Sequence, residues 1–209
     1  MLEVLKETGV GRTFVVLFDR ETYRPYAERL HLSLSERVRC FLLFSKRVDN
    51  YSWSTISSNI VELLRDKQIR QVSFVVFESA GLIALDLALN QIKLVRSIVF
   101  VDPSFRSDSS YINRHLSWLE DLLPMGLPFR SKIEGFDAKP FLQRVRCPSL
   151  VVKSGLGGSY SQQQGDLLAN HLPVSWKYSL TGEDDEISAL CDVVGRFQEV
   201  PAKCPQKNR

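Results

Sequence analysis

A serine at position 79 lies between an apolar segment and a segment of small residues. Residues 72–77 (Val-Ser-Phe-Val-Val-Phe) are followed by Glu78, Ser79, Ala80 and Gly81. Where a buried strand turns sharply into a helix, a serine hydroxyl is exposed at the strand tip, and the next backbone N–H faces the substrate carbonyl. The positive end of the helix also stabilises an oxyanion. Ser79 is therefore a candidate nucleophile for acyl transfer, with the Ala80 N–H as the oxyanion donor.

A serine nucleophile requires a base, and the chain has three histidines, His31, His115 and His171. His171 ends a predicted helix, where its charge suits the helix dipole, and His31 follows the first predicted helix. We expect His115 to be the histidine that can reach over the strand ends, and Glu183, acting through a water molecule, is a second candidate base. Loss of a triad base lowers the rate by several orders of magnitude. The placement of His115 and Glu183 therefore decides whether Ser79 can react.

Four polar residues follow the apolar runs that are expected to be strands. Asp19 and Arg20 come after the first run, Glu78 after the third and Asp102 after the fourth. A crevice opens at the carboxyl ends of parallel strands where the strand order reverses, so we expect these residues to line a ligand-binding crevice. Glu78 is expected to pair with Arg20. Asp102 precedes a proline, which favours a turn-capping role over that of a relocated catalytic acid.

Two other segments contain residue types that bind ions. Residues 155–158 (Gly-Leu-Gly-Gly) could cradle a phosphate, but no Lys-Ser/Thr follows, so we interpret them as a flexible loop. Residues 183–186 (Glu-Asp-Asp-Glu) could hold a cation, but acids also cap a helix N-terminus, which is our interpretation. The four cysteines have no CxxC or Cys/His spacing. We therefore expect neither a metal site nor an organic cofactor.

Strand and helix signals alternate along the chain, which is typical of an α/β fold. The first five strand candidates are apolar on successive residues, which indicates a parallel sheet with helices on both faces. We predict a single domain over residues 1–209, a three-layer sandwich with a mostly parallel sheet of about six strands. The predicted strands are 13–18, 38–44, 72–77, 97–101, 149–153 and 176–180, and the predicted helices are 23–30, 55–68, 80–89, 111–122, 162–171 and 186–197.

Residues 104–146 interrupt this alternation because they contain no strand signal. We predict a short helical cap insertion over the strand ends, followed by a short helix at 141–145. Residues 201–209 contain two prolines and three basic residues, and we expect a frayed tail.

The composition, with 44% hydrophobic and 24% charged residues, is that of a globular protein. Lys and Arg number 27 against 24 Asp and Glu, and this net charge of +3 without a basic stripe argues against nucleic-acid binding. The apolar runs are too short to span a membrane, and the N-terminus has no secretory signal pattern. Unpaired cysteines favour free thiols in a reducing cytoplasm.

From about position 12 to position 197 the chain resembles the α/β-hydrolase family. The resemblance is carried by the segment around Ser79, by residues 99–103 (Val-Phe-Val-Asp-Pro), and by residues 146–155, which are similar to the family's penultimate strand. The insertion at 104–146 stands where the family has its cap, and the first family strands are missing or reduced to residues 1–10. The resemblance implies a nucleophile, a base and an acid, and the nucleophile position matches Ser79.

The other positions of the family pattern carry different residues. Glycines at 155–158 stand where the acid is expected, and Glu183 stands after Gly182 where the base is expected. Asp19 and Arg20 stand where the family has His-Gly in its oxyanion loop, and Phe77 replaces the glycine two residues before the nucleophile. The scaffold therefore matches the family, while its catalytic triad is incomplete.

Three functions remain open at this point. The first is a binding or interaction protein without a complete triad, which holds a small apolar or acyl ligand or a protein partner. The second is an esterase or thioesterase that uses Ser79 with an unusual base, His115 or Glu183. The third is a nucleotide-binding α/β domain that uses the glycines at 155–158.

Overall fold

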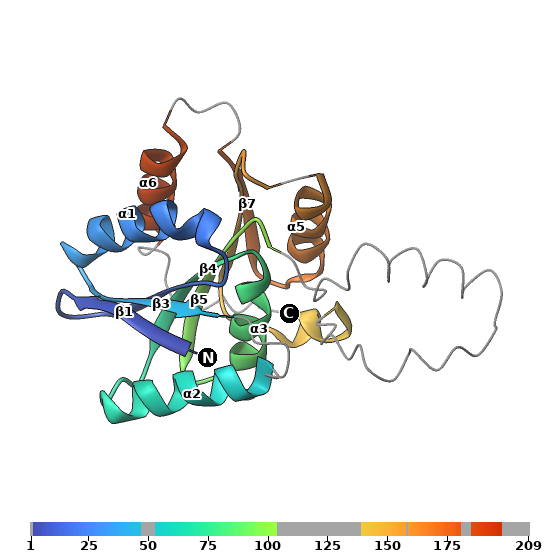
Figure 1. Ribbon diagram of the computed structural model, residues 1–209. Helices are drawn as coiled ribbons and strands as arrows, with labels where there is room; N and C mark the ends of the chain where they lie inside the picture. The colour runs from blue at the N-terminus through green and yellow to red at the C-terminus, as the bar shows by residue number, and fades with distance from the viewer. Residues whose placement is uncertain (1, 47–52, 104–138, 158, 181–184, 198–209) are drawn as a thin grey trace.

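The computed structural model describes residues 2–46, 53–103, 139–157, 159–180 and 185–197. Within these ranges seven strands form one sheet with helices on both faces (Figure 1). The strands are β1 (Leu2–Thr8), β2 (Thr13–Phe18), β3 (Arg39–Ser45), β4 (Val72–Phe77), β5 (Val95–Val101), β6 (Ser149–Lys153) and β7 (Ser175–Ser179). The helices are α1 (Arg24–Ser35), α2 (Trp53–Asp66), α3 (Gly81–Asn90), α5 (Ser159–His171) and α6 (Glu186–Phe197), with short 3₁₀ helices η1 (Glu21–Tyr23), η2 (Glu78–Ala80) and η4 (Lys139–Arg144).

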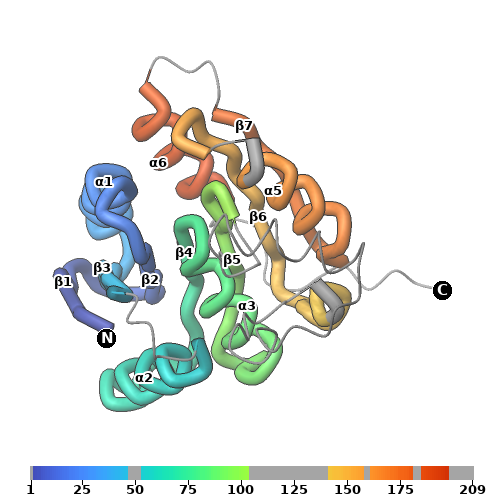
Figure 2. The backbone as a smooth tube through the Cα atoms, turned by 45° about the vertical axis from the view of Figure 1, so that its right-hand side comes forward, coloured from blue at the N-terminus to red at the C-terminus, as the bar shows by residue number. Residues whose placement is uncertain are grey.

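The sheet is parallel from β2 to β7, in the order β1-β3-β2-β4-β5-β6-β7 (Figure 2). The chain moves outward in one direction from β2 to β3 and in the other from β4 to β7, so the order reverses between β2 and β4. The predicted mostly parallel α/β sandwich is therefore confirmed. This is the place where open α/β sheets leave a crevice at the carboxyl ends of their strands.

Helices pack on both faces of the sheet because its central strands are apolar on both sides. Every residue of β2 and β4 is buried. Side chains such as Val16, Leu42 and Val75 form one core with α1 and α6. On the other face, side chains such as Val15 and Phe74 form a second core with α2, α3 and α5. These two cores fix where each strand ends, and therefore where the polar residues that follow the strands lie.

The strand β1 was not among the predicted strands, and it raises the predicted sheet of about six strands to seven. It pairs antiparallel with β3 at the edge of the sheet. Only Leu2 and Leu5 of β1 are partly buried, and charged residues stand between them and after them. A strand with no apolar run gives no strand signal, since an edge position requires little burial. It lies within residues 1–10, the segment in which the resemblance implied that the first family strands are missing or reduced.

The boundaries of the other helices and strands differ from the predicted boundaries by a few residues. The exception is α1, which ends at Ser35, whereas the predicted helix ended at residue 30. Of the predicted cap insertion, the structure describes the end, where η4 overlaps the short helix predicted at 141–145. The rest of the cap, the predicted helix 111–122 and the tail 201–209 lie outside the described residues. None of the described helices is long and apolar enough to cross a lipid bilayer.

Candidate functional site

The polar residues expected at the crevice do lie together. Leu17 of β2 pairs with Val76 of β4, so Asp19 and Glu78 follow two adjacent strands at the same edge of the sheet. Asp102 follows β5, the next strand along. Burial raises the pKa of the phenol of Tyr23, in η1, and the nearby charges of Asp102, Glu78 and Asp19 raise it further.

The sharp turn from β4 into α3 is made at Glu78. Its φ is +48°, in the left-handed region that residues with a side chain rarely adopt. Ser79 has no positive φ and lies one residue further, inside η2. The sequence prediction placed the strained turn at Ser79, and the structure places it one residue earlier. A glutamate gives no signal for a left-handed conformation, so the motif alone could not show this shift.

The shift changes which groups the turn presents. The side chain of Glu78 extends from the tip of β4. The backbone N–H that follows the left-handed residue is that of Ser79 and not that of Ala80, and Ala80 is fully buried. The Ser79 side chain is 3% exposed, and its hydroxyl donates a hydrogen bond to the Oδ2 atom of Asp19. The described partner of the candidate nucleophile is therefore a carboxylate.

Arg20 and Glu78 form the expected ion pair across the reversal point. The distance from Arg20 Nε to Glu78 Oε2 is 3.0 Å, and the side chains are 46% and 15% exposed. Because the pair reaches solvent, its contribution to stability is small. Arg20 is the more exposed member of the pair, whereas Ser79, next to Glu78 in the chain, is buried.

Asp102 connects the end of β5 to the end of β6. It is buried and also has a φ of +48°. Its Oδ1 atom accepts a hydrogen bond from the Ser154 backbone N–H at 2.8 Å, and its Oδ2 atom accepts one from the Ser154 hydroxyl. Burial raises the pKa of Asp102, while the hydrogen bonds from Ser154 and Tyr23 act to lower it. Among the described residues Asp102 therefore ties the segment after β5 to the segment after β6 and has no hydrogen bond to a histidine, while its turn-capping role stays a prediction.

The glycine loop after β6 is held by carboxylates of the chain itself. The Gly155 backbone N–H donates to Glu186 at 2.9 and 3.1 Å, and Tyr26 donates to the same carboxylate at 3.3 Å. A Cβ atom at Gly157 would lie 2.5 Å from Asp102 Oδ1. The loop amide that could have met a phosphate thus already has an anionic partner.

The acidic segment before α6 includes Asp185, which caps the helix by accepting from the Ser188 N–H at 3.1 Å.

Two of the three histidines lie away from the carboxyl edge. His31, fully buried, is hydrogen-bonded to Thr8, which pairs with Cys40 near the start of β3. His171 is the last residue of α5, the helix that returns the chain to the beginning of β7. His115 and Glu183, the two candidate bases, lie outside the described residues. The described part of the chain thus provides Ser79 with Asp19 and with no imidazole.

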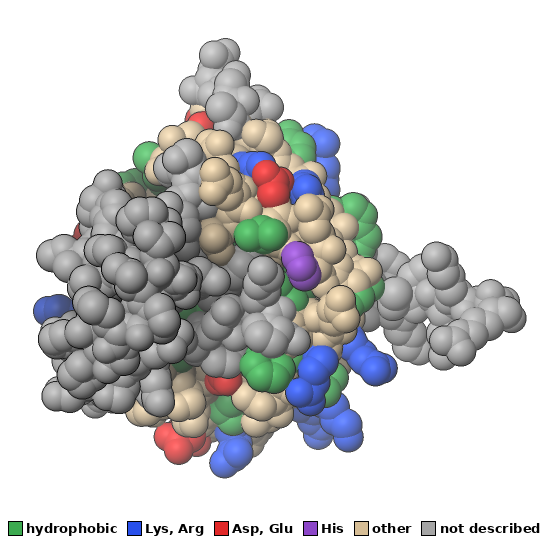
Figure 3. Space-filling view, turned by 90° about the vertical axis from the view of Figure 1, so that its right-hand side faces the viewer, with side chains coloured by type: hydrophobic (Ala, Val, Ile, Leu, Met, Phe, Trp, Pro, Cys, Tyr) green, Lys and Arg blue, Asp and Glu red, His purple; other side chains and the backbone are tan. Residues whose placement is uncertain are grey.

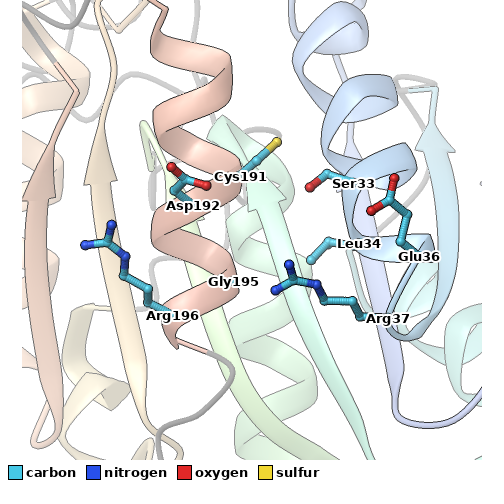
Figure 4. Close-up of a pocket in the computed structure, with 8 residues that line it drawn as sticks. All are labelled: Ser33, Leu34, Glu36, Arg37, Cys191, Asp192, Gly195 and Arg196. Atoms are coloured by element: carbon cyan, nitrogen blue, oxygen red, sulfur yellow. The ribbon is translucent and has the colours of Figure 1, made fainter.

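Sequence reasoning missed Tyr23, Tyr26 and Ser154, and it named Glu186 only as part of the acidic segment 183–186. Tyr23 and Tyr26 lie in η1 and α1, and Ser154 follows β6, so only the fold shows that these residues converge. Two of the cavities in the described part of the chain lie away from this edge. One, of about 260 Å³, is lined by the ends of α1 and α6, including Arg37 and Arg196 (Figure 4). The other, of about 360 Å³, lies between α2 and α3.

Comparison with known structures identifies the scaffold. No protein-family model and no curated protein matches the chain. A thermophilic esterase from Thermogutta terrifontis is 12% identical, with a TM-score of 0.74 over 94% of this chain and 92% of that one. An enol-lactonase from Burkholderia xenovorans is 14% identical (TM-score 0.69, 94% and 96%), and an α/β hydrolase from Sphaerobacter thermophilus is 13% identical (TM-score 0.65, 94% and 96%). The chain therefore has the α/β-hydrolase fold, as the resemblance implied.

Proposed function

We propose that this chain is a non-catalytic binding protein on the α/β-hydrolase fold. The observation that carries the proposal is the left-handed residue at the tip of β4, which is Glu78 and not Ser79. The turn therefore directs a carboxylate, already paired with Arg20, to the place where a serine acyl-transfer enzyme presents its nucleophilic hydroxyl. Ser79 is buried, and its hydroxyl donates a hydrogen bond to Asp19.

Asp19 supports the same conclusion through electrostatics. An acyl-transfer site stabilises the oxyanion with hydrogen-bond donors placed where negative charge develops. Asp19 stands where the resemblance expects part of that donor set, and its carboxylate would repel an oxyanion formed beside Ser79. A carboxylate is also a far weaker base than an imidazole, so it activates a serine hydroxyl poorly.

The ligand that suits this edge is a small acyl compound with a carboxylate or carbonyl group. Arg20 is nearly half exposed, and a guanidinium binds such oxygens in a fixed fork geometry. The described residues at this edge are polar, which favours an acyl ligand over a purely apolar one. A protein side chain with a terminal carboxylate would use the same contact.

The described cysteines Cys40, Cys147 and Cys191 are free thiols, which supports a cytoplasmic location.

Labelling with a fluorophosphonate probe, together with hydrolysis of p-nitrophenyl esters, tests the non-catalytic part. We expect the wild type to react no faster than Ser79→Ala. Ser73→Ala, which changes another buried serine in β4, is the matched control. Labelling that disappears in Ser79→Ala and persists in Ser73→Ala would overturn the proposal.

Calorimetric titration with short-chain fatty carboxylates tests the binding part. We expect binding that is lost in Arg20→Ala and retained in Arg70→Ala, an exposed arginine before β4. Equal binding by both variants would assign the ligand to another surface.

An ester or thioester hydrolase that uses Ser79 is the second candidate. It is favoured by the esterases and the lactonase among the similar structures and by a serine at the strand-to-helix turn. It would need His115 or Glu183 as the base, and the labelling experiment distinguishes it from the binding protein. A nucleotide-binding function has less support, because Glu186 already accepts the Gly155 N–H.

A further inference from the structure

The strand β7 is an exposed edge of the sheet. It is the last strand in the sheet order, and in the described part of the chain no strand lies beyond it. α5 and α6 lie on its two sides (Figure 1). Two aromatic side chains two residues apart, Trp176 and Tyr178, are 45% and 38% exposed. An edge strand with exposed apolar residues is a template for pairing with another chain.

The hydrogen bonds to β6 show which backbone groups of β7 point outward. The Val174 carbonyl accepts from the Ser149 N–H at 3.0 Å, and the Leu180 N–H donates to the Lys153 carbonyl at 2.7 Å. These even-numbered residues turn their backbone groups toward β6. Because alternate residues of a strand turn their N–H and C=O groups to opposite sides, Ser175 and Lys177 turn theirs to the open edge.

The two edges of the sheet differ in their protection. The outer strand β1 carries Glu3, Lys6 and Glu7, and charges of this kind discourage edge pairing. The strand β7 has one charged residue, Lys177, and its ammonium lies 3.3 Å from Asp166 of α5. Figure 3, which views the side of the molecule that carries α5, shows acidic and basic side chains next to one another. The charge of β7 is thus partly neutralised within its own chain.

We propose that β7 pairs antiparallel with β7 of a second copy of this chain, with the two-fold axis at Lys177. The strand reads Ser-Trp-Lys-Tyr-Ser, which is nearly the same in both directions. In an isologous interface each residue meets the partner residue on the other side of the axis, so this near-palindrome places similar residue types opposite one another. Lys177 exchanges both backbone hydrogen bonds with Lys177 of the partner subunit.

The same register places aromatic residues opposite one another. Trp176 faces Tyr178 of the partner subunit in a non-hydrogen-bonded pair, where side chains of antiparallel strands are closest. Trp176 is already oriented by its edge contact with Phe197, at 5.7 Å between ring centroids. The strand has five residues, so its edge buries less area than the roughly 1,200 Å² of a stable interface. We therefore expect a weak dimer whose population depends on concentration.

Sedimentation velocity of the full chain over a wide concentration range tests this proposal. We expect a monomer–dimer equilibrium. Lys177→Pro removes an outward N–H without removing a bond to β6, and proline is tolerated at such edge positions. We expect it to raise the dimer dissociation constant by at least roughly tenfold. Lys177→Ala keeps the N–H and loses only the ion pair, so it should dimerise at least as well as the wild type.

A second variant keeps the test decisive if the proline disturbs folding, which an unfolding curve would show. Tyr178→Glu leaves the backbone intact and places a carboxylate beside Trp176 of the partner subunit, so it should also weaken the dimer. A wild type that stays monomeric at the highest concentration would overturn the proposal. A dimer that is equally strong in a folded Lys177→Pro variant and in Tyr178→Glu would do the same.

Discussion

The hydroxyl of Ser79, at the end of β4, donates its hydrogen bond to the carboxylate of Asp19, at the end of β2. Parallel pairing of the two strands brings these residues together although they are far apart in sequence. The positions belong to an α/β-hydrolase scaffold, but the group beside the serine is an anion. An anion at this place opposes the negative charge that acyl transfer would develop there.

The contact between Asp19 and Ser79 should contribute measurably to stability. We expect Asp19→Ala to lower the free energy of unfolding by about 1–3 kcal/mol, because a buried hydroxyl loses a charged acceptor. Urea denaturation measures this change. Asp66→Ala, at the exposed end of α2, is the control and should stay within about 0.5 kcal/mol of the wild type. An Asp19→Ala variant as stable as the wild type would contradict the assigned hydrogen bond.

Because Glu78 has a left-handed backbone conformation, we expect glycine at this position to give a more stable protein than alanine. Glu78→Ala and Glu78→Gly both lose the ion pair with Arg20, but only glycine adopts a φ of +48° without steric cost. The glycine variant should therefore be more stable than the alanine variant by about 1 kcal/mol. Chemical denaturation of both variants decides the point, and an alanine variant that is the more stable of the two would be incompatible with this backbone geometry.

The sequence was sufficient to predict the scaffold and the edge of the sheet at which several polar residues lie. Successive apolar residues predicted buried parallel strands, and the acids after those strands were expected at one edge, where Asp19, Glu78 and Asp102 do lie. The position of the left-handed turn was not predictable, because it depends on how β4 enters α3 and not on residue type. Tyr23 and Ser154 were missed because their contacts with Asp102 depend on the packing of separate elements.

Two glycines near α6 should respond to alanine in opposite ways. A Cβ atom at Gly157 would lie 2.5 Å from Asp102 Oδ1, so Gly157→Ala must displace Asp102 from Ser154 and should destabilise the fold by about 1–3 kcal/mol. At Gly195, inside α6, a Cβ atom meets nothing within 4 Å. Gly195→Ala should therefore stabilise the protein by about 0.5–1 kcal/mol through helix propensity. Thermal unfolding midpoints that move in the same direction would contradict these placements.

Asp102 should produce a pH dependence opposite to that of a carboxylate whose pKa is lowered by its partners, such as Asp166. Burial raises its pKa in the folded state. The folded protein therefore binds a proton more tightly than the unfolded chain, and between the two pKa values stability falls as the pH rises. Asp102→Asn removes this titration, tolerates the left-handed φ and keeps a carbonyl oxygen for the Ser154 N–H.

The experiment compares unfolding free energies of the wild type and Asp102→Asn by urea denaturation at a series of pH values. We expect the variant to gain stability relative to the wild type as the pH rises from about 4, and the gain to level off above the folded pKa of Asp102. Asp166→Asn is the matched control, because hydrogen bonds from Lys153 and Lys177 lower the pKa of Asp166. This variant should lose stability relative to the wild type as the pH rises over the acidic range, since the ionised wild-type carboxylate is the stabilised form. A pH-independent difference for Asp102→Asn would mean that burial does not govern the ionisation of this carboxyl group.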